Sequence, residues 1–157
     1  MASVLDKSML DTSDLARFWI WVEKTDTCWN WTGRTDAKGY GRMQTSSGQF
    51  LTHRISWAIE HGTTDSGLFL DHACHNAACV RPDHLRLATV KQNAENLLPV
   101  RAASGYRGVY PAKGKWSAMV KHNGKIYRSG KHLTPESANE AAIEMRNQLF
   151  THNLLDR

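Results

Sequence analysis

Residues 68–97 read LFLDHACHNAACVRPDHLRLATVKQNAENL, and this stretch decides the fold of the first part of the chain. Two short apolar runs, 68–73 and 84–89, are predicted to be strands on either side of a compact polar loop. Thr89 is predicted to cap a helix, because the glutamine three residues later completes a capping box, and Pro99 is predicted to follow its end. The predicted order is strand, loop, strand, helix.

The loop between the two predicted strands contains metal-binding side chains. Cys74, Cys79 and His84 follow a C-x4-C-x4-H spacing, which supplies three of the four ligands that structural zinc prefers. The chain has three cysteines, so they cannot all pair as disulfides, and Cys28 is the natural fourth ligand. The alternative is that the cysteines are buried and inert and that the histidine lies on the surface.

Asp71 and His72 stand at the end of the first predicted strand, and Asn93 lies in the predicted helix. A carboxylate, an imidazole and an amide oxygen are the groups that a hard divalent ion and a general base require. Taken alone, an Asp-His pair more often lies on an ordinary surface. Its interest comes from its position beside the metal-binding loop.

Upstream of this stretch the pattern predicts two helices and one hairpin. Ser13 is the predicted N-cap of an amphipathic helix over 15–24. Residues 38–53 alternate apolar and polar side chains around a Thr-Ser-Ser-Gly turn, which indicates a hairpin. Thr52 is predicted to cap a second helix that Gly62 ends.

From Ser104 onward the pattern changes. Segments 106–110, 115–122 and 125–133 are predicted strands joined by tight turns, one of them an Asn-Gly turn. Thr134 is a predicted N-cap with proline at the first helical position, followed by an Ala-rich apolar stripe. We therefore expect two domains, residues 1–100 and 101–157, with the boundary near 99–105.

The positive charge of the chain is concentrated in its last third. Residues 1–100 hold ten Lys/Arg and eleven Asp/Glu, whereas residues 101–157 hold ten and four, an excess of six positive charges. Such a segment favours a polyanionic partner such as nucleic acid. The alternative is a solvated surface with a biased charge.

The composition excludes some other classes of protein. A hydrophobic fraction of 41% with six Trp is typical of a globular protein, and no apolar run is long enough to span a membrane. The first residues do not form a secretory signal, so we expect a cytoplasmic protein with reduced thiols, no disulfide framework and no membrane partner.

The stretch LTHRISWAIEHG with the quoted segment 68–97 resembles the phage-type HNH endonucleases, a group of the His-Me finger nucleases, and CWNWTG with GYGRM resembles the part that precedes it. The resemblance covers about residues 15–98 and implies a ββα-metal nuclease domain. It implies that His72 is the general base and that Asp71 and Asn93 hold a catalytic Mg²⁺ or Mn²⁺. His84 stands where the HNH pattern often has its middle asparagine. Its spacing also resembles the zinc-braced loop of His-Cys box homing endonucleases, and it is therefore assigned to zinc.

The segment 104–152 resembles the plant APETALA2/ethylene-response-factor DNA-binding domain, through YRGV, GKW and TPESA before an Ala-rich helix. The resemblance implies a three-stranded antiparallel sheet that enters the major groove and is packed on one helix. Trp116 is expected to pack beneath the sheet. The DNA-facing residues that the resemblance implies are Arg107, Tyr110, Lys113, Lys121 and Arg128.

Together these features predict an α+β chain that acts as a homing-type endonuclease on double-stranded DNA inside a bacterium or a phage-infected host. Arg42 and Arg54 are candidates for a cation near the scissile phosphate, with a structural salt bridge as the alternative for either. Two other functions stay open: a DNA-binding regulator with an inert nuclease centre, and a nuclease of low sequence specificity. The target site is also open, as is the choice between monomer and homodimer.

Overall fold

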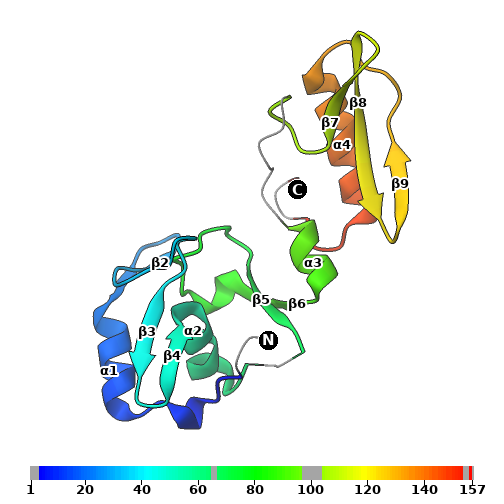
Figure 1. Cartoon of the computed structure of the whole chain (residues 1–157). Coiled ribbons are helices and arrows are strands. Elements are labelled where there is room, and N and C mark those ends of the chain that lie inside the picture. The colour runs from blue at the N-terminus through cyan, green and yellow to red at the C-terminus, as the bar shows by residue number, and fades with distance from the viewer. Residues whose placement is uncertain (1–3, 65–66, 97–103, 154–155, 157) are drawn as a thin grey trace. The chain divides into compact units, whose positions relative to one another are not determined.

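The computed structural model describes residues 4–64, 67–96, 104–153 and 156 (Figure 1). Short helices alternate with small antiparallel sheets, in agreement with the predicted α+β class. The chain divides into two compact units, Met1–Val90 and Lys91–Arg157, and each is described here by itself. Helix α3 (Val90–Glu95) groups with the second unit. The expected boundary at 99–105 lies outside the described residues except for 104 and 105, as does the predicted helix stop at Pro99.

The first helix is α1 (Thr12–Ile20), and both of its ends differ from the prediction. Asp11 is the N-cap in place of Ser13, because its carboxylate accepts a hydrogen bond from the Asp14 backbone N–H at 2.8 Å. The helix ends early because the chain turns into a hairpin, in which β1 (Val22–Lys24) pairs with β2 (Trp29–Trp31). This pairing overrides the helical apolar pattern of residues 21–24.

The next elements confirm the predicted hairpin and helix: β3 (Arg42–Thr45), β4 (Gly48–Leu51) and α2 (Thr52–His61). Gly62 ends the helix with a φ of +87°, as predicted. The predicted cap is wrong, since Thr52 is the first helical residue and Leu51 occupies the N-cap position. Gly41 allows the chain to approach α2 closely, because a Cβ there would lie 2.1 Å from Thr52 Oγ1.

Residues 69–88 form a hairpin of β5 (Phe69–His72) and β6 (Leu85–Ala88), with the short 3-10 helix η2 (Pro82–His84) in the loop between them. Both predicted strands are confirmed. In this register Asp71 lies opposite Arg86, and His72 lies opposite Leu85. The order β5, β6, α3 is the order of a ββα-metal finger, but α3 belongs to the second unit, so its packing on the hairpin stays a prediction.

The core of the first unit is formed by apolar side chains from the N-terminal segment, from both longer helices and from strands β2 to β4, together with Val80 of the loop between β5 and β6. Phe18 is fully buried, packs edge-on against Trp19 and stacks on Trp31. The buried residues of this core are Leu5, Leu10, Phe18, Trp31, Met43, Phe50, Ile55, Ala58 and Val80.

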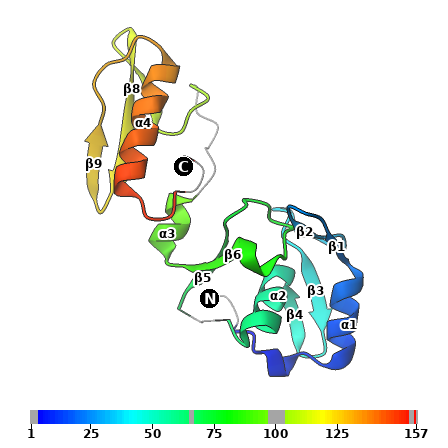
Figure 2. The same cartoon turned by 180° about the vertical axis from the view of Figure 1, so that it is seen from behind.

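The second unit contains a three-stranded antiparallel sheet and one long helix, as predicted (Figure 2). Its elements are β7 (Val109–Ala112), β8 (Lys115–His122), β9 (Lys125–Arg128) and α4 (Pro135–Leu149). The first strand begins three residues later than predicted. Thr134 caps α4 by accepting a hydrogen bond from the Ser137 backbone N–H, as the sequence indicated.

The helix α4 covers one face of this sheet. Ala138 and Ala142 of α4 form a small core with Val109 and Ala118 of the strands, and Trp116 packs against it, as expected. Both turns have residues with positive φ, and Asn123-Gly124 is the Asn-Gly turn that the sequence singled out.

Replacing Phe18 with alanine is expected to destabilise the first unit by about 3–5 kcal/mol, because the change removes a large, fully buried ring. Ile20 is the matched control, since it lies on the same helix but is 77% exposed, and Ile20→Ala should change stability by about 0.5 kcal/mol or less. Urea unfolding followed by tryptophan fluorescence measures this unit, because five of the six tryptophans lie before residue 90. Equal effects of the two substitutions would contradict this view of the core.

Candidate functional site

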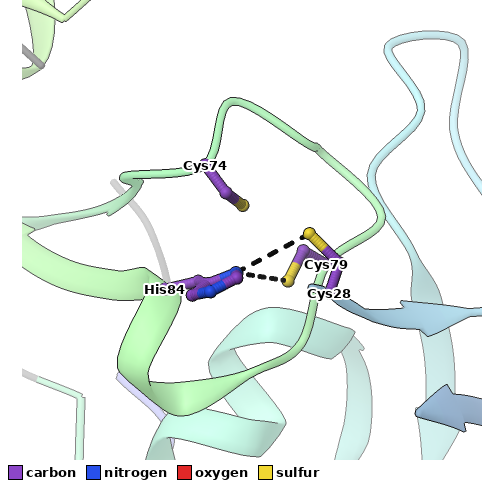
Figure 3. A group of neighbouring side chains, drawn as sticks. All are labelled: Cys28, Cys74, Cys79 and His84. Carbon is purple, nitrogen blue, oxygen red and sulfur yellow. Dashed lines mark hydrogen bonds between the residues drawn. The ribbon is translucent and has the colours of Figure 1, made fainter. Parts of the chain in front are cut away.

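Four side chains converge on the loop between β5 and β6 (Figure 3). The ligand atoms of Cys28, Cys74, Cys79 and His84 all lie within 4.8 Å of one another. The Cys28 and Cys79 sulfurs each lie 3.6 Å from His84 Nδ1, and all three cysteines are free thiols. The structure thus brings together the four residues that the sequence predicted as a group.

Backbone pairing explains how Cys28, far away in the sequence, reaches this loop. Asn30 and Cys79 form an isolated antiparallel bridge. The Val80 N–H donates to the Trp29 carbonyl at 2.7 Å, and the Trp31 N–H donates to the Ala78 carbonyl at 2.8 Å. These bonds join the loop to β2 and place Cys28 beside Cys79. The β1–β2 hairpin, which the sequence analysis missed, is therefore part of the site.

The donor set of this cluster fits zinc. Three sulfurs and one imidazole nitrogen are the ligands of a structural zinc site with four protein ligands. Burial raises the pKa of the Cys74 thiol and raises that of Cys79 to about 12, so both are neutral in the metal-free chain at neutral pH. A bound cation would favour their thiolate forms.

His72 lies directly before this loop and is buried. Its Nε2 lies 3.0 Å from the Cys79 carbonyl oxygen. A carbonyl oxygen only accepts hydrogen bonds, so Nε2 carries the ring proton and Nδ1 is the basic nitrogen of the neutral ring. Burial lowers the pKa of His72, against the raising effects of this hydrogen bond and of Asp71, which favours the neutral ring at neutral pH. The arrangement can therefore present a base.

Asp71 forms an ion pair across the hairpin. Arg86 Nε and Nη2 donate to Asp71 Oδ2 at 3.0 and 2.9 Å. Asp71 thus has a carboxylate held in place by the half-buried Arg86, and carboxylate oxygens are ligands that hard cations prefer. Sequence reasoning missed Arg86, although counting outward from the loop along the two strands places it opposite Asp71.

Asn93 lies on α3, in the second unit, so a shared site with Asp71 and His72 stays a prediction. Within the second unit, α3 is firmly held. Glu95 is buried and accepts hydrogen bonds from the backbone N–H groups of Thr151 and His152. Arg107 donates from Nη1 to the Glu95 carbonyl at 3.0 Å and from Nη2 to the Ala94 carbonyl.

The two arginines considered near the scissile phosphate have protein partners. Arg42 Nη2 lies 3.3 Å from Asp36 Oδ2 in an ion pair. Arg54 is buried, and its Nη2 donates to Thr64 Oγ1 at 2.9 Å. The Arg42 contact is the structural salt bridge that was the alternative for this residue, whereas the Arg54 contact is a hydrogen bond to a hydroxyl group.

The predicted DNA-facing residues lie in three different places. Cross-strand partners share a face, and β8 alternates, so Tyr110, Lys121 and Arg128 all lie on the face of the sheet opposite α4. Lys113 is exposed in the β7–β8 turn. Arg107 differs from the expectation, because its half-buried guanidinium binds the end of α3.

One residue that sequence reasoning did not single out is His53, in the first turn of α2. Its ring lies 4.7 Å from the ring of His72 and is 3% exposed. The sequence gives only the position of this histidine at the start of a predicted helix. Its burial in the first turn of α2 is seen in the structure.

Among the residues that the structure describes, no helix has both the length and the apolar character needed to cross a membrane.

Comparisons with known proteins agree with the predicted nuclease family. Residues 50–95 match the family model described as HNH endonuclease, and this segment contains the end of β4, α2, the β5–β6 hairpin and α3. The chain is 33% identical over 73 residues to "Protein 7.7" of Escherichia phage T7, covering 46% of this chain and 56% of that protein. It is 34% identical over 83 residues to "Protein 2.8" of the same phage, covering 51% and 56%.

The chain spans about half the length of these curated relatives. No solved structure matches the chain. The matched segment contains Asp71, His72 and Asn93, and it ends before the sheet of the second unit. The match to the HNH endonuclease family therefore covers the segment that holds all three residues predicted to form the catalytic site.

Proposed function

We propose that the chain is a metal-dependent DNA endonuclease in which His72 is the general base. The observation that carries the proposal is the hydrogen bond from His72 Nε2 to the Cys79 carbonyl, within the segment that matches the HNH endonuclease family. That bond leaves Nδ1 as the nitrogen that takes a proton from the attacking water.

Asp71 and Asn93 are the proposed ligands of the catalytic ion, Mg²⁺ or Mn²⁺. When bound, such an ion stabilises negative charge on the phosphate and on the leaving 3′ oxygen. Arg86 fixes the Asp71 carboxylate through two hydrogen bonds. His72 accepts the proton of the water as the water oxygen bonds to phosphorus and the P–O3′ bond breaks. The leaving 3′ oxygen takes up a proton from solvent, so that the products carry a 5′ phosphate and a 3′ hydroxyl.

Cys28, Cys74, Cys79 and His84 are the proposed ligands of a structural zinc. The support is the convergence of four donors within 4.8 Å in a loop that has little regular structure of its own. Zinc here would hold the Cys79 backbone, and with it the carbonyl that orients His72.

The second unit is proposed to bind DNA in the manner of an APETALA2-like domain, with the domains at residues 1–100 and 101–157. Its support is the exposed face that carries Tyr110, Lys121 and Arg128, together with the positive charge of this part of the chain. A nuclease domain joined to a separate DNA-binding domain suggests a homing-type enzyme that prefers particular sites. A DNA-binding regulator with an inert centre is the second candidate.

Purified full chain is expected to nick or cut plasmid DNA in Mg²⁺, and EDTA should stop the reaction. His72→Ala should lower the single-turnover rate by about 100- to 10,000-fold, because the general base is lost. His61→Ala is the matched control, since this exposed histidine packs against Trp57 at the far end of α2. A wild-type protein without activity would favour the regulator, and smeared digestion of genomic DNA would favour a nuclease of low specificity.

Zinc analysis tests the structural site. Atomic absorption should find one zinc per chain, and Cys74→Ser or His84→Ala should remove most of it while His61→Ala retains it. Because burial raises the pKa of both Cys74 and Cys79, zinc must displace protons from the thiols, so zinc affinity should fall as the pH falls. The proposed zinc site would be contradicted by wild-type protein that contains no zinc, or by a full zinc content in Cys74→Ser.

DNA-binding titrations over a range of salt concentrations test the second unit. Lys121→Ala and Arg128→Ala should each weaken binding and reduce the slope of log K against log salt by about 1, because each removes one phosphate contact. Lys7→Ala, an exposed cation of the 3-10 helix η1 (Lys7–Met9) in the first unit, is the charge-matched control. If all three variants behave alike, the sheet face does not bind DNA.

A further inference from the structure

The second histidine beside the proposed base has no role in the function described so far. His53 lies in the first turn of α2, and its side chain is 3% exposed. Burial and the nearby His72 lower the pKa of His53 to about 3, so its ring is uncharged at any pH at which the chain would act.

His53 meets His72 through ring packing. The two ring centroids are 4.7 Å apart, and the planes are inclined by 67°, which is an edge-to-face arrangement. Tyr40 lies against both rings, with its centroid 5.6 Å from that of His53 and 5.8 Å from that of His72. Edge-to-face contacts between aromatic rings are favourable and orient the rings relative to each other.

Hydrogen bonding at Nδ1 does not explain why position 53 is a histidine. Within the described part of the chain, His53 Nδ1 is buried and has no hydrogen-bond partner. A buried nitrogen without a partner costs stability, so the site keeps a histidine despite that cost. What reaches His72 is therefore the flat, uncharged ring of His53.

We infer that His53 is a positioning residue that holds the His72 ring in the orientation required for catalysis. The Cys79 carbonyl fixes which nitrogen of His72 carries the proton, and the His53 ring limits rotation of the imidazole away from that hydrogen bond. The inference rests on the proposed function, because it concerns His72 as the base. Misplacement of a reacting group by about 1 Å can cost on the order of a hundredfold in rate.

Two substitutions of similar size distinguish the effect of an aromatic ring at position 53 from the effect of filling the same volume. His53→Phe keeps an aromatic ring against His72, whereas His53→Leu fills the space without one. We expect His53→Leu to lower kcat by about tenfold to a hundredfold with KM unchanged, because DNA binding does not involve this buried residue. His53→Phe should stay close to the wild-type kcat, and His61→Ala on the same helix serves as the control.

A spectroscopic readout accompanies the kinetics. The imidazole ¹⁵N shifts of His72, measured on the DNA-free full chain, should show one tautomer protonated at Nε2 in the wild type and in His53→Phe. In His53→Leu they should move toward the average of the two tautomers. A purely structural role for His53 would alter the unfolding midpoint but leave these shifts in place.

The outcomes distinguish the inference from the proposed function. The proposed function is wrong if the wild-type chain does not cleave DNA or if His72→Ala is fully active. In either case the ¹⁵N shifts still test whether the His53 ring orients the His72 ring. If wild type is active and His72→Ala is not, a His53→Leu variant with wild-type kcat and unchanged His72 shifts overturns the inference. Equal losses of kcat in His53→Leu and His53→Phe overturn it as well.

Discussion

The hydrogen bond between His72 Nε2 and the Cys79 carbonyl connects the two parts of the site in the first unit. The sulfur of Cys79 belongs to the Cys/His cluster, while its carbonyl oxygen fixes the tautomer of the histidine that precedes the loop. An irregular loop has no ladder of hydrogen bonds to define its backbone, so its geometry depends on the groups that hold it. Here those groups are the bridge to β2 and the four donors of the cluster.

The second unit is held together by packing contacts of its own. Buried alanines of α4 support the sheet from one side, which leaves the opposite face with its cations exposed. The same unit fastens α3 through Glu95 and Arg107, and α3 carries Asn93.

Local patterns in the sequence predicted much of this arrangement, because caps, turns and alternation are encoded over short distances. The β5–β6 hairpin, the Gly62 stop, the Asn123-Gly124 turn and the α4 start all follow such signals. The β1–β2 hairpin was missed because its residues also fit a helical stripe, and only pairing with distant residues decides between the two. The ion pair of Asp71 with Arg86, the packing of Arg107 and the burial of His53 likewise depend on tertiary contacts that spacing does not report.

The central claim is that a zinc-braced loop presents His72 as the base of a DNA-cleaving site. Its most direct test is the single-turnover rate of plasmid cleavage at fixed Mg²⁺, measured as zinc is returned stepwise to stripped, full-length protein. The account predicts that the rate rises in proportion to zinc occupancy and that no such rise occurs in His72→Ala. Full cleavage by folded, zinc-free protein would contradict it.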